Sequence, residues 1–248
     1  MNCPSCGKAI ENWENVQFCT FCGRSLKSGD IREESHGYSP WDDRANRGFF
    51  RALFETWVES IFRPTKFFAA MPLKGGYGGP LLYGFIVGEI AVLFSLFWQG
   101  IFMMMGTFGE RYDQLEAMGL SMGMVALVIG ALLSPVFIIM GYFITAAILH
   151  LCLFIVGGAR RDFEATFRVI CYAAGANLFN IIPFCGWLGA WLWNTLLNII
   201  GVREAHEIST GRALLAYSLP AVACCGFLVL AFFLAFPHIS EWFEYWGN

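Results

Sequence analysis

The chain has 248 residues, of which 57% are hydrophobic and only 14% are charged. A soluble globular protein has roughly 45–50% apolar and about 25% charged residues, so this composition argues against that class and indicates a membrane protein. The formal net charge is -3, but ten of the sixteen Lys and Arg residues lie at or before Lys74. The first twenty residues contain no apolar h-region, so no signal peptide is expected.

Two CxxC pairs, each followed by a glycine, stand at the N-terminus in the order Cys3, Cys6, Cys19 and Cys22. Two thiolates three residues apart can hold one ion from a tight turn, and two such pairs complete a tetrahedral site suited to Zn(2+). Disulfides, or thiols without a metal, are the alternatives. A module of residues 1–26 is too small to bury a sufficient core, so the metal would supply its folding free energy.

The sequence therefore predicts a zinc ribbon over residues 1–26. Ribbons of this kind bind proteins, bind nucleic acid or only fold. No basic patch with interleaved aromatic residues accompanies this one, so nucleic acid is not expected, and a cytosolic protein is the expected partner.

Residues 27–46 are polar and rich in turn-forming residues, which is typical of a flexible linker. Residues 47–75 are expected to form an amphipathic interfacial helix and a segment leading into the membrane domain. Apolar residues recur at i, i+1, i+4 and i+5 up to Pro64, so one helical face is apolar. We expect this helix to lie in the headgroup plane, and docking against the membrane helices or a partner is the alternative. The expected membrane-interface residues are Arg47, Arg51, Trp57 and Arg63.

Five apolar stretches follow, and each is expected to cross the membrane: residues 80–105, 122–156, 166–182, 185–202 and 213–236. A helix needs about 20 apolar residues to cross ~30 Å of hydrocarbon, so the third and fourth stretches are near the lower limit. The expected fold class is an all-α polytopic membrane protein, with five transmembrane helices in a membrane domain over residues 76–248. Membrane lipid is therefore an expected partner.

The second stretch is long enough to hold two spans broken at Ser134-Pro135, because its helix would reach ~50 Å at ~1.5 Å per residue. The distribution of positive charge favours a single span. With five spans, fifteen of the sixteen Lys and Arg residues lie on the N-terminal side and only Arg111 lies opposite. A sixth span would move the last two Arg clusters to the outer side, the first with Arg160, Arg161 and Arg168 and the second with Arg203 and Arg212. The positive-inside rule then predicts a cytoplasmic N-terminus, an external C-terminus and one long helix kinked near Pro135.

Glu89 is the one carboxylate within these expected spans, and His150 is the one histidine. At ~1.5 Å per residue they lie ~13 Å and ~10 Å from the inner ends of their spans, so they could pair across helices. An ionisable group inside a membrane is expensive and is treated as a functional candidate. A structural pair, or a protonated Glu89 bonded to a backbone carbonyl, is the alternative.

Four asparagines form two further stripes, with Asn177 and Asn180 on one face of the third expected span and Asn194 and Asn198 on one face of the fourth. Asparagines that face each other across a helical hairpin usually hold the helices together. A polar pathway for a substrate is the alternative. The sequence contains no recognised catalytic motif, so no enzymatic activity is expected, and His206 in the last inner loop is expected to be solvated.

The stretch from Arg161 to Pro220 resembles the Yip1-domain family. The likeness is carried by residues 163–172 (FEATFRVICY), 182–183 (IP), 186–189 (GWLG), Trp193, 200–201 (IG) and 206–213 (HEISTGRA), with 62–68 (FRPTKFF) upstream. It covers roughly residues 50–235. The resemblance implies five spans and a cytoplasmic N-terminal region. Eukaryotic members take part in vesicle trafficking and bind Rab-type GTPases and one another.

This chain lacks the acidic Asp-Leu-Tyr-Gly-Pro motif of the eukaryotic members, and residues 77–80 (YGGP) are at best a fragment of it. Rab binding is therefore not expected here. A zinc ribbon fused in front is typical of the bacterial members, so the resemblance implies the bacterial type and the inner membrane.

The sequence predicts a multi-pass scaffold or adaptor with a role in membrane organisation or trafficking, whose ribbon recruits a cytosolic protein. Homo-oligomerisation through small-residue helix faces is a further expectation. The alternative is a small transporter, channel or lipid-handling protein that uses Glu89, His150 and the asparagines.

Overall fold

The computed structural model describes residues 37, 39–107 and 114–247, and within these ranges the regular secondary structure is entirely helical. In chain order the elements are α2 (Arg44–Arg47), α3 (Phe49–Phe62), α4 (Pro64–Ala70), α5 (Gly78–Thr107), α6 (Gln114–Ile155), α7 (Phe163–Ala173), the 3-10 helix η2 (Ala174–Ile181), α8 (Gly186–Ala205) and α9 (Thr210–Gly247). The expected all-helical class is confirmed for these residues.

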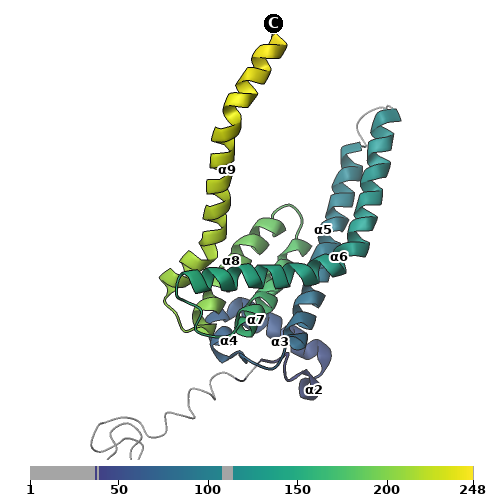
Figure 1. Ribbon diagram of the computed structural model, residues 1–248. Coiled ribbons are helices and arrows are strands. Elements are labelled where there is room, and N and C mark those ends of the chain that lie inside the picture. The colour runs from purple at the N-terminus through teal and green to yellow at the C-terminus, as the bar shows by residue number, and fades with distance from the viewer. Residues whose placement is uncertain (1–36, 38, 108–113, 248) are drawn as a thin grey trace, which may run out of the picture.

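Short and medium helices form a body from which longer helices extend on one side (Figure 1). The body contains α2, α3, α4, α7, η2 and α8. The hairpin of α5 and α6 leaves the body on the same side as α9. Within the body, η2 packs between α5 and α8, and α7 contacts α3, α5, α6 and α8. The element α7 is therefore the centre around which the body is built.

Three helices among the described residues are long and apolar enough to cross a membrane: Gly78–Met105, Met122–Ile155 and Thr210–Val229. The five expected spans are thus not confirmed. The expected third span is divided into α7 and η2, and residues 165–176 are buried inside the body. A helix that is apolar on all sides can be buried in a protein core as well as in lipid, which explains why hydropathy alone did not separate the two.

The helix α6 is a single element with Pro135 inside it, and its ribbon bends partway along (Figure 1). Proline has no N–H group, so the carbonyl four residues earlier, that of Ala131, loses its helical donor. The Ser134 hydroxyl oxygen lies 2.9 Å from that carbonyl oxygen and replaces the missing donor. A single long helix with Pro135 inside it is therefore observed, and not two helices broken at Ser134-Pro135.

The segment 47–75 forms two helices, α3 and α4, which meet at Arg63 and Pro64. Proline is favoured at the first position of a helix because its missing N–H would have no partner there. The buried residues of α3 are the small Ala52, Thr56 and Ser60, together with Ile61 near its end. The small size of the first three lets the α3 backbone approach the body closely.

An aromatic cluster holds the N-terminal part of the described chain to α4, α5 and α7. The ring centroids of Trp41 and Tyr83 are 5.8 Å apart, those of Tyr83 and Tyr172 are 5.3 Å apart, and those of Phe67 and Tyr172 are 5.3 Å apart. All four rings are almost fully buried. Such rings bury large apolar areas and add favourable edge contacts.

The turn between η2 and α8 depends on a glycine. A Cβ atom placed on Gly186 would collide with the carbonyl oxygen of Phe179, whereas one on Gly189 would lie at an ordinary 3.8 Å from the Phe179 ring. Phe184 in the same turn has a left-handed φ of 64°. The turn is therefore tight, and the two backbones leave no room for a side chain at Gly186.

We expect Gly186→Ala to lower the free energy of unfolding by about 1–3 kcal/mol, because backbone must shift to admit the methyl group. The measurement is the thermal unfolding midpoint of the purified protein in detergent. Gly189→Ala is the matched control, one turn further along α8, and should change the midpoint little. Equal effects of the two variants would contradict the close approach at Gly186.

Candidate functional site

The last part of the predicted linker is docked onto the membrane domain. Trp41 is fully buried, and its Nε1 donates a hydrogen bond to the Gly79 carbonyl at 2.7 Å. Ser39 is also buried. The linker was predicted to continue to Asn46, whereas in the structure residues 39–46 include this anchor and the start of α2. A single buried tryptophan provides enough apolar area to hold an otherwise polar segment.

An ionic cluster with a buried guanidinium lies beside this anchor, and we call it the Arg168 clamp; its members are Asp42, Glu164, Arg168 and Tyr172. The side chain of Arg168 has an exposed fraction of only 2%, and its Nη1 lies 3.2 Å from Asp42 Oδ2. Its Nε lies 3.3 Å from Glu164 Oε1. The Tyr172 hydroxyl donates to Asp42 Oδ2 at 3.1 Å.

The clamp also holds the loop before α5. The backbone N–H of Gly76 donates to Glu164 Oε1 at 2.7 Å, and Arg168 Nη2 donates to the Gly76 carbonyl at 3.4 Å. The guanidinium thus joins the residue-42 segment, the residue-76 loop and α7. In the sequence, Arg168 stands out only as one of the positive charges. Its isolated position in an apolar run was the signal that could have identified a buried ion pair.

A second polar cluster, the histidine relay, consists of His150 on α6, Thr166 on α7 and His206 after α8. The Arg161 backbone N–H donates to His206 Nδ1 at 3.2 Å, so the neutral ring carries its hydrogen on Nε2. That nitrogen lies 2.9 Å from Thr166 Oγ1, and Thr166 Oγ1 lies 2.8 Å from His150 Nδ1. The hydrogen bonds therefore run from His206 through Thr166 to His150.

The relay corrects the expectation that His206 is solvated, because its side chain is fully buried. Burial, with smaller contributions from His150 and Arg161, lowers the pKa of His206 to about 4. The adjacent loops are also paired, since Arg161 Nη2 lies 2.6 Å from Glu207 Oε1. Sequence reasoning missed this residue because a loop position gives no sign of burial.

Glu89 and His150 have different partners. The Ser134 hydroxyl oxygen lies 2.6 Å from Glu89 Oε1, and the second carboxylate oxygen is buried without a hydrogen-bond partner. Ser134 and His150 are sixteen positions apart on α6, which is ~24 Å along a helix at ~1.5 Å per residue. The two residues that could have paired are therefore found in two separate contacts.

The four asparagines also separate into two sets. The Asn194 amide donates to the Ala173 carbonyl at 3.1 Å, and the Asn198 amide donates to Asn194 Oδ1 at 2.7 Å. This first set ties α8 to the end of α7. Asn177 and Asn180 instead line a cavity of about 400 Å³ between α5, α6 and η2. The two stripes do not face each other across the hairpin.

The expected interfacial residues lie on or next to α3. The half-buried Trp57 donates from Nε1 to the Gly175 carbonyl at 3.0 Å, which fixes α3 to η2. Arg51 Nε and Arg47 Nη1 lie 2.7 Å and 2.8 Å from the two oxygens of Glu55. These hydrogen bonds, that from Arg51 first, lower the pKa of the Glu55 carboxyl. Arg63 is exposed at the junction of α3 and α4.

Two alternatives were open for α3: a position in the headgroup plane, or docking against the membrane helices. Each describes one side of the helix. The small residues face the body, whereas a row of phenylalanines points outward. Phe50, Phe54 and Phe62 have exposed fractions of 82%, 62% and 69%. An exposed aromatic row on a membrane protein is suited to contact with lipid.

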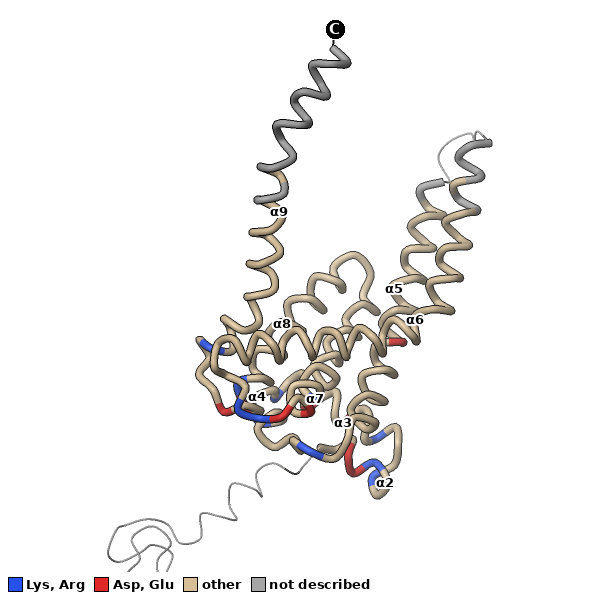
Figure 2. The backbone as a smooth tube through the Cα atoms, viewed as in Figure 1, with Lys and Arg blue, Asp and Glu red and all other residues tan. Residues whose placement is uncertain are grey.

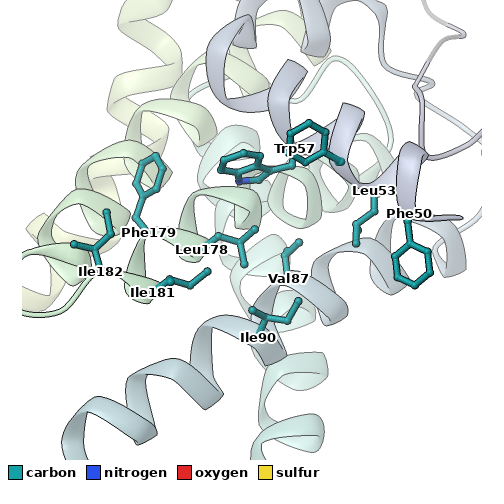
Figure 3. Close-up of a pocket in the computed structure, with 10 residues that line it drawn as sticks. Phe50, Leu53, Trp57, Val87, Ile90, Leu178, Phe179, Ile181 and Ile182 are labelled. Atoms are coloured by element: carbon teal, nitrogen blue, oxygen red, sulfur yellow. The ribbon is translucent and has the colours of Figure 1, made fainter. Parts of the chain in front are cut away.

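An apolar groove of about 570 Å³ runs between α3, α5 and η2 (Figure 3). The side chains around it in the close-up come from all three elements, with Phe50 and Trp57 from α3, Val87 and Ile90 from α5, and Leu178 and Phe179 from η2. None of its lining side chains is charged. The groove is therefore suited to a hydrocarbon surface and not to a polar ligand.

The predicted zinc ligands Cys3, Cys6, Cys19 and Cys22 lie outside the described residues. Within the described part of the chain, no group of three or more His, Cys, Asp or Glu side chains could hold a metal ion. The zinc site stays a prediction from the cysteine spacing.

We expect Arg168→Leu to lower the free energy of unfolding by about 1–3 kcal/mol, because Asp42 and Glu164 lose the hydrogen bonds of the buried guanidinium. The measurement is chemical or thermal unfolding in detergent. The control is Arg161→Leu, which breaks an exposed pair with Glu207 and should cost below about 1 kcal/mol. Equal losses would contradict the assignment of the buried Arg168 guanidinium as the centre of the clamp.

We expect acidification to weaken the fold through His206. Its pKa is about 4 when folded and 6.5 when unfolded, so its stabilising contribution is complete above pH 6.5 and is lost as the pH falls toward 4. His206→Gln keeps polar atoms in place but does not titrate. The free energy of unfolding should therefore decline less steeply between pH 6.5 and 4 in this variant than in the original protein. Parallel pH profiles would contradict the burial of a neutral His206.

Comparison with protein families places these features in a known group. The model of the Yip1 domain matches residues 58–233, which is more than half of the chain. The comparisons with curated proteins and with solved structures gave no match. The matched range contains α7, which carries Arg168 and Thr166, and most of the three apolar helices. The chain is a membrane protein that belongs to the Yip1 domain family.

Proposed function

We propose that this chain is an integral membrane scaffold of the bacterial inner membrane. Its N-terminal cysteines bind zinc, and the resulting ribbon recruits a cytosolic protein to the membrane. Membership of the Yip1 domain family supports the membrane placement. The cysteine spacing supports a metal-stabilised module, because so small a segment cannot bury a sufficient core.

The observation that carries this proposal is the anchored root of the N-terminal segment. Trp41 is buried against Gly79, and Asp42 is held by Arg168 and Tyr172. The segment that follows the N-terminal cysteines therefore joins the membrane domain at a fixed point. A buried anchor of this kind suits an adaptor, because it fixes where the recruiting segment begins.

The distribution of charge supports a cytoplasmic location for that anchor. In the described chain, charged residues are concentrated on the helical body, and the extended parts of the long helices carry few (Figure 2). Three spans give the same fifteen-to-one division of Lys and Arg as five, because the two extra crossings enclose only residues 183–184. The positive-inside rule thus favours a cytoplasmic N-terminus for either number of spans.

The transporter alternative has less support than the scaffold. A shared pathway would need Glu89 and His150 to act together, yet Glu89 contacts Ser134 and His150 contacts Thr166. Asn194 and Asn198 bind backbone and each other, which is a structural role. Structural hydrogen bonds of this kind contribute about 0.6–2 kcal/mol each in membrane proteins.

We expect Cys19→Ser in the full-length protein to abolish both zinc binding and partner capture. The first measurement is the zinc content of the purified protein. The second is crosslinking followed by affinity purification from its host cells. Cys224→Ser changes an exposed thiol on α9 and is the matched control, which should retain both properties. Partner capture that survives the loss of zinc would contradict the proposed role of the ribbon.

A further inference from the structure

The cavity that Asn177 and Asn180 line is polar but uncharged. It has a volume of about 400 Å³ and lies between α5, α6 and η2. Its other polar groups are the hydroxyls of Ser95, Tyr142 and Thr145, and none of its lining residues is ionisable at neutral pH. Ligand sites typically have volumes of about 300–1,000 Å³, so the cavity can hold a small polar group.

Most of these polar groups have no partner within the described protein. Tyr142 donates its hydroxyl hydrogen to the Gly84 carbonyl at 2.8 Å. The described residues give the Asn177 and Asn180 amides and the Ser95 and Thr145 hydroxyls no side-chain hydrogen bond. Unpaired polar groups are costly in a hydrocarbon environment, so a polar occupant would be stabilised there.

The depth of the cavity follows from the anchor of α3. Trp57 binds Gly175, and Asn177 and Asn180 are two and five residues further along η2. At ~2 Å per residue in a 3-10 helix, they lie ~4 Å and ~10 Å beyond that anchor. With α3 in the headgroup plane, as its exposed phenylalanines indicate, both asparagines lie within ~10 Å of the level of that anchor. The glycerol and ester groups of lipids occupy that level.

The cavity opens on the side of α6. Thr145 is exposed, and its neighbours Phe143 and Ile144 have exposed fractions of 38% and 52%. These residues belong to a helix that is apolar enough to cross a membrane. An amphiphile could therefore enter from the bilayer, with its polar group in the cavity and its chains along the apolar surface.

We propose that this cavity binds an uncharged, glycerol-type group through the amides of Asn177 and Asn180 and the hydroxyls of Ser95 and Thr145. Amides and hydroxyls both donate and accept, which matches a ligand that carries several hydroxyl or ester oxygens. The absence of ionisable groups from the cavity lining favours an uncharged ligand. The group can come from a neutral diacylglycerol or from a free polyol. The inference rests on the interfacial position of α3 and does not depend on the zinc ribbon.

The test uses a dioleoylglycerol that carries a photoreactive diazirine, added to the full-length protein in nanodiscs of a zwitterionic lipid. Crosslinked peptides are identified by mass spectrometry. Labelling is expected on the segments of α5, α6 and η2 that line the cavity. Asn180→Leu removes one amide and should weaken this labelling about tenfold, the factor that corresponds to ~1.4 kcal/mol.

Gly141→Leu fills the cavity without touching its amides, since a Cβ atom at Gly141 meets only open space. It should also abolish the labelling. Gly226→Leu is the matched control, because Gly226 also faces open space but lies on α9, outside the cavity. Each variant is first compared with the original protein by its thermal unfolding midpoint, so that a folding defect is recognised.

Competitors separate the sources of the ligand. Competition by unlabelled dioleoylglycerol alone assigns the site to a lipid, and competition by free glycerol as well assigns it to a polyol. Either result supports the proposal. Equal labelling of all variants would show ordinary contact with surrounding lipid and would overturn it. Equal competition by anionic phosphatidic acid would overturn the uncharged ligand, and loss of self-association in Asn180→Leu without loss of labelling would assign the amides to contact between copies.

Discussion

A buried guanidinium in an otherwise apolar body is the constraint on which this structure depends. Arg168 has an exposed fraction of 2%, and a charge so far from water requires partners with opposite charge. Glu164 supplies one from the same helix, and Asp42 supplies the other from a segment 126 residues earlier in the chain. The need to neutralise Arg168 thus brings the segment before α2 onto α7. Trp41, next to Asp42, is brought to the body with it. The burial of Trp41 against Gly79 then fixes the start of the membrane domain.

The second constraint is the close approach of the α3 backbone to the helical body. Ala52, Thr56 and Ser60 let α3 lie against the body, and Trp57 then reaches the Gly175 carbonyl. This contact turns the phenylalanines of α3 outward and sets the level of the apolar groove and of the uncharged cavity relative to the helix. The arrangement of both cavities therefore depends on the small side chains of α3 together with its Trp57 anchor.

Sequence reasoning was most successful where one physical signal dominated. Pro64 separates α3 from α4, and Pro135 interrupts α6, because proline cannot donate the helical hydrogen bond. Reasoning from the sequence failed where two environments, such as a protein core and the lipid bilayer, give the same hydropathy pattern. The stretch 166–182 is as apolar as a membrane span, but the structure buries most of it inside the body. His206 follows a helix in a polar loop, and only the contacts of Thr166 and Arg161 show that it is buried. Zinc binding by the N-terminal cysteines likewise stays a prediction, because it rests on the single signal of their spacing.

The sequence by itself determined that this chain is a helical membrane protein, that its positive charge lies mainly on the N-terminal side of its spans, and where prolines interrupt its helices. These properties depend on composition and on neighbours a few residues apart. Only the tertiary structure decided which apolar stretches are buried by protein, that Glu89 and His150 have different partners, and that Asp42 meets Arg168. Such outcomes depend on contacts between residues far apart in the chain, and hydropathy carries no information about which segments will meet.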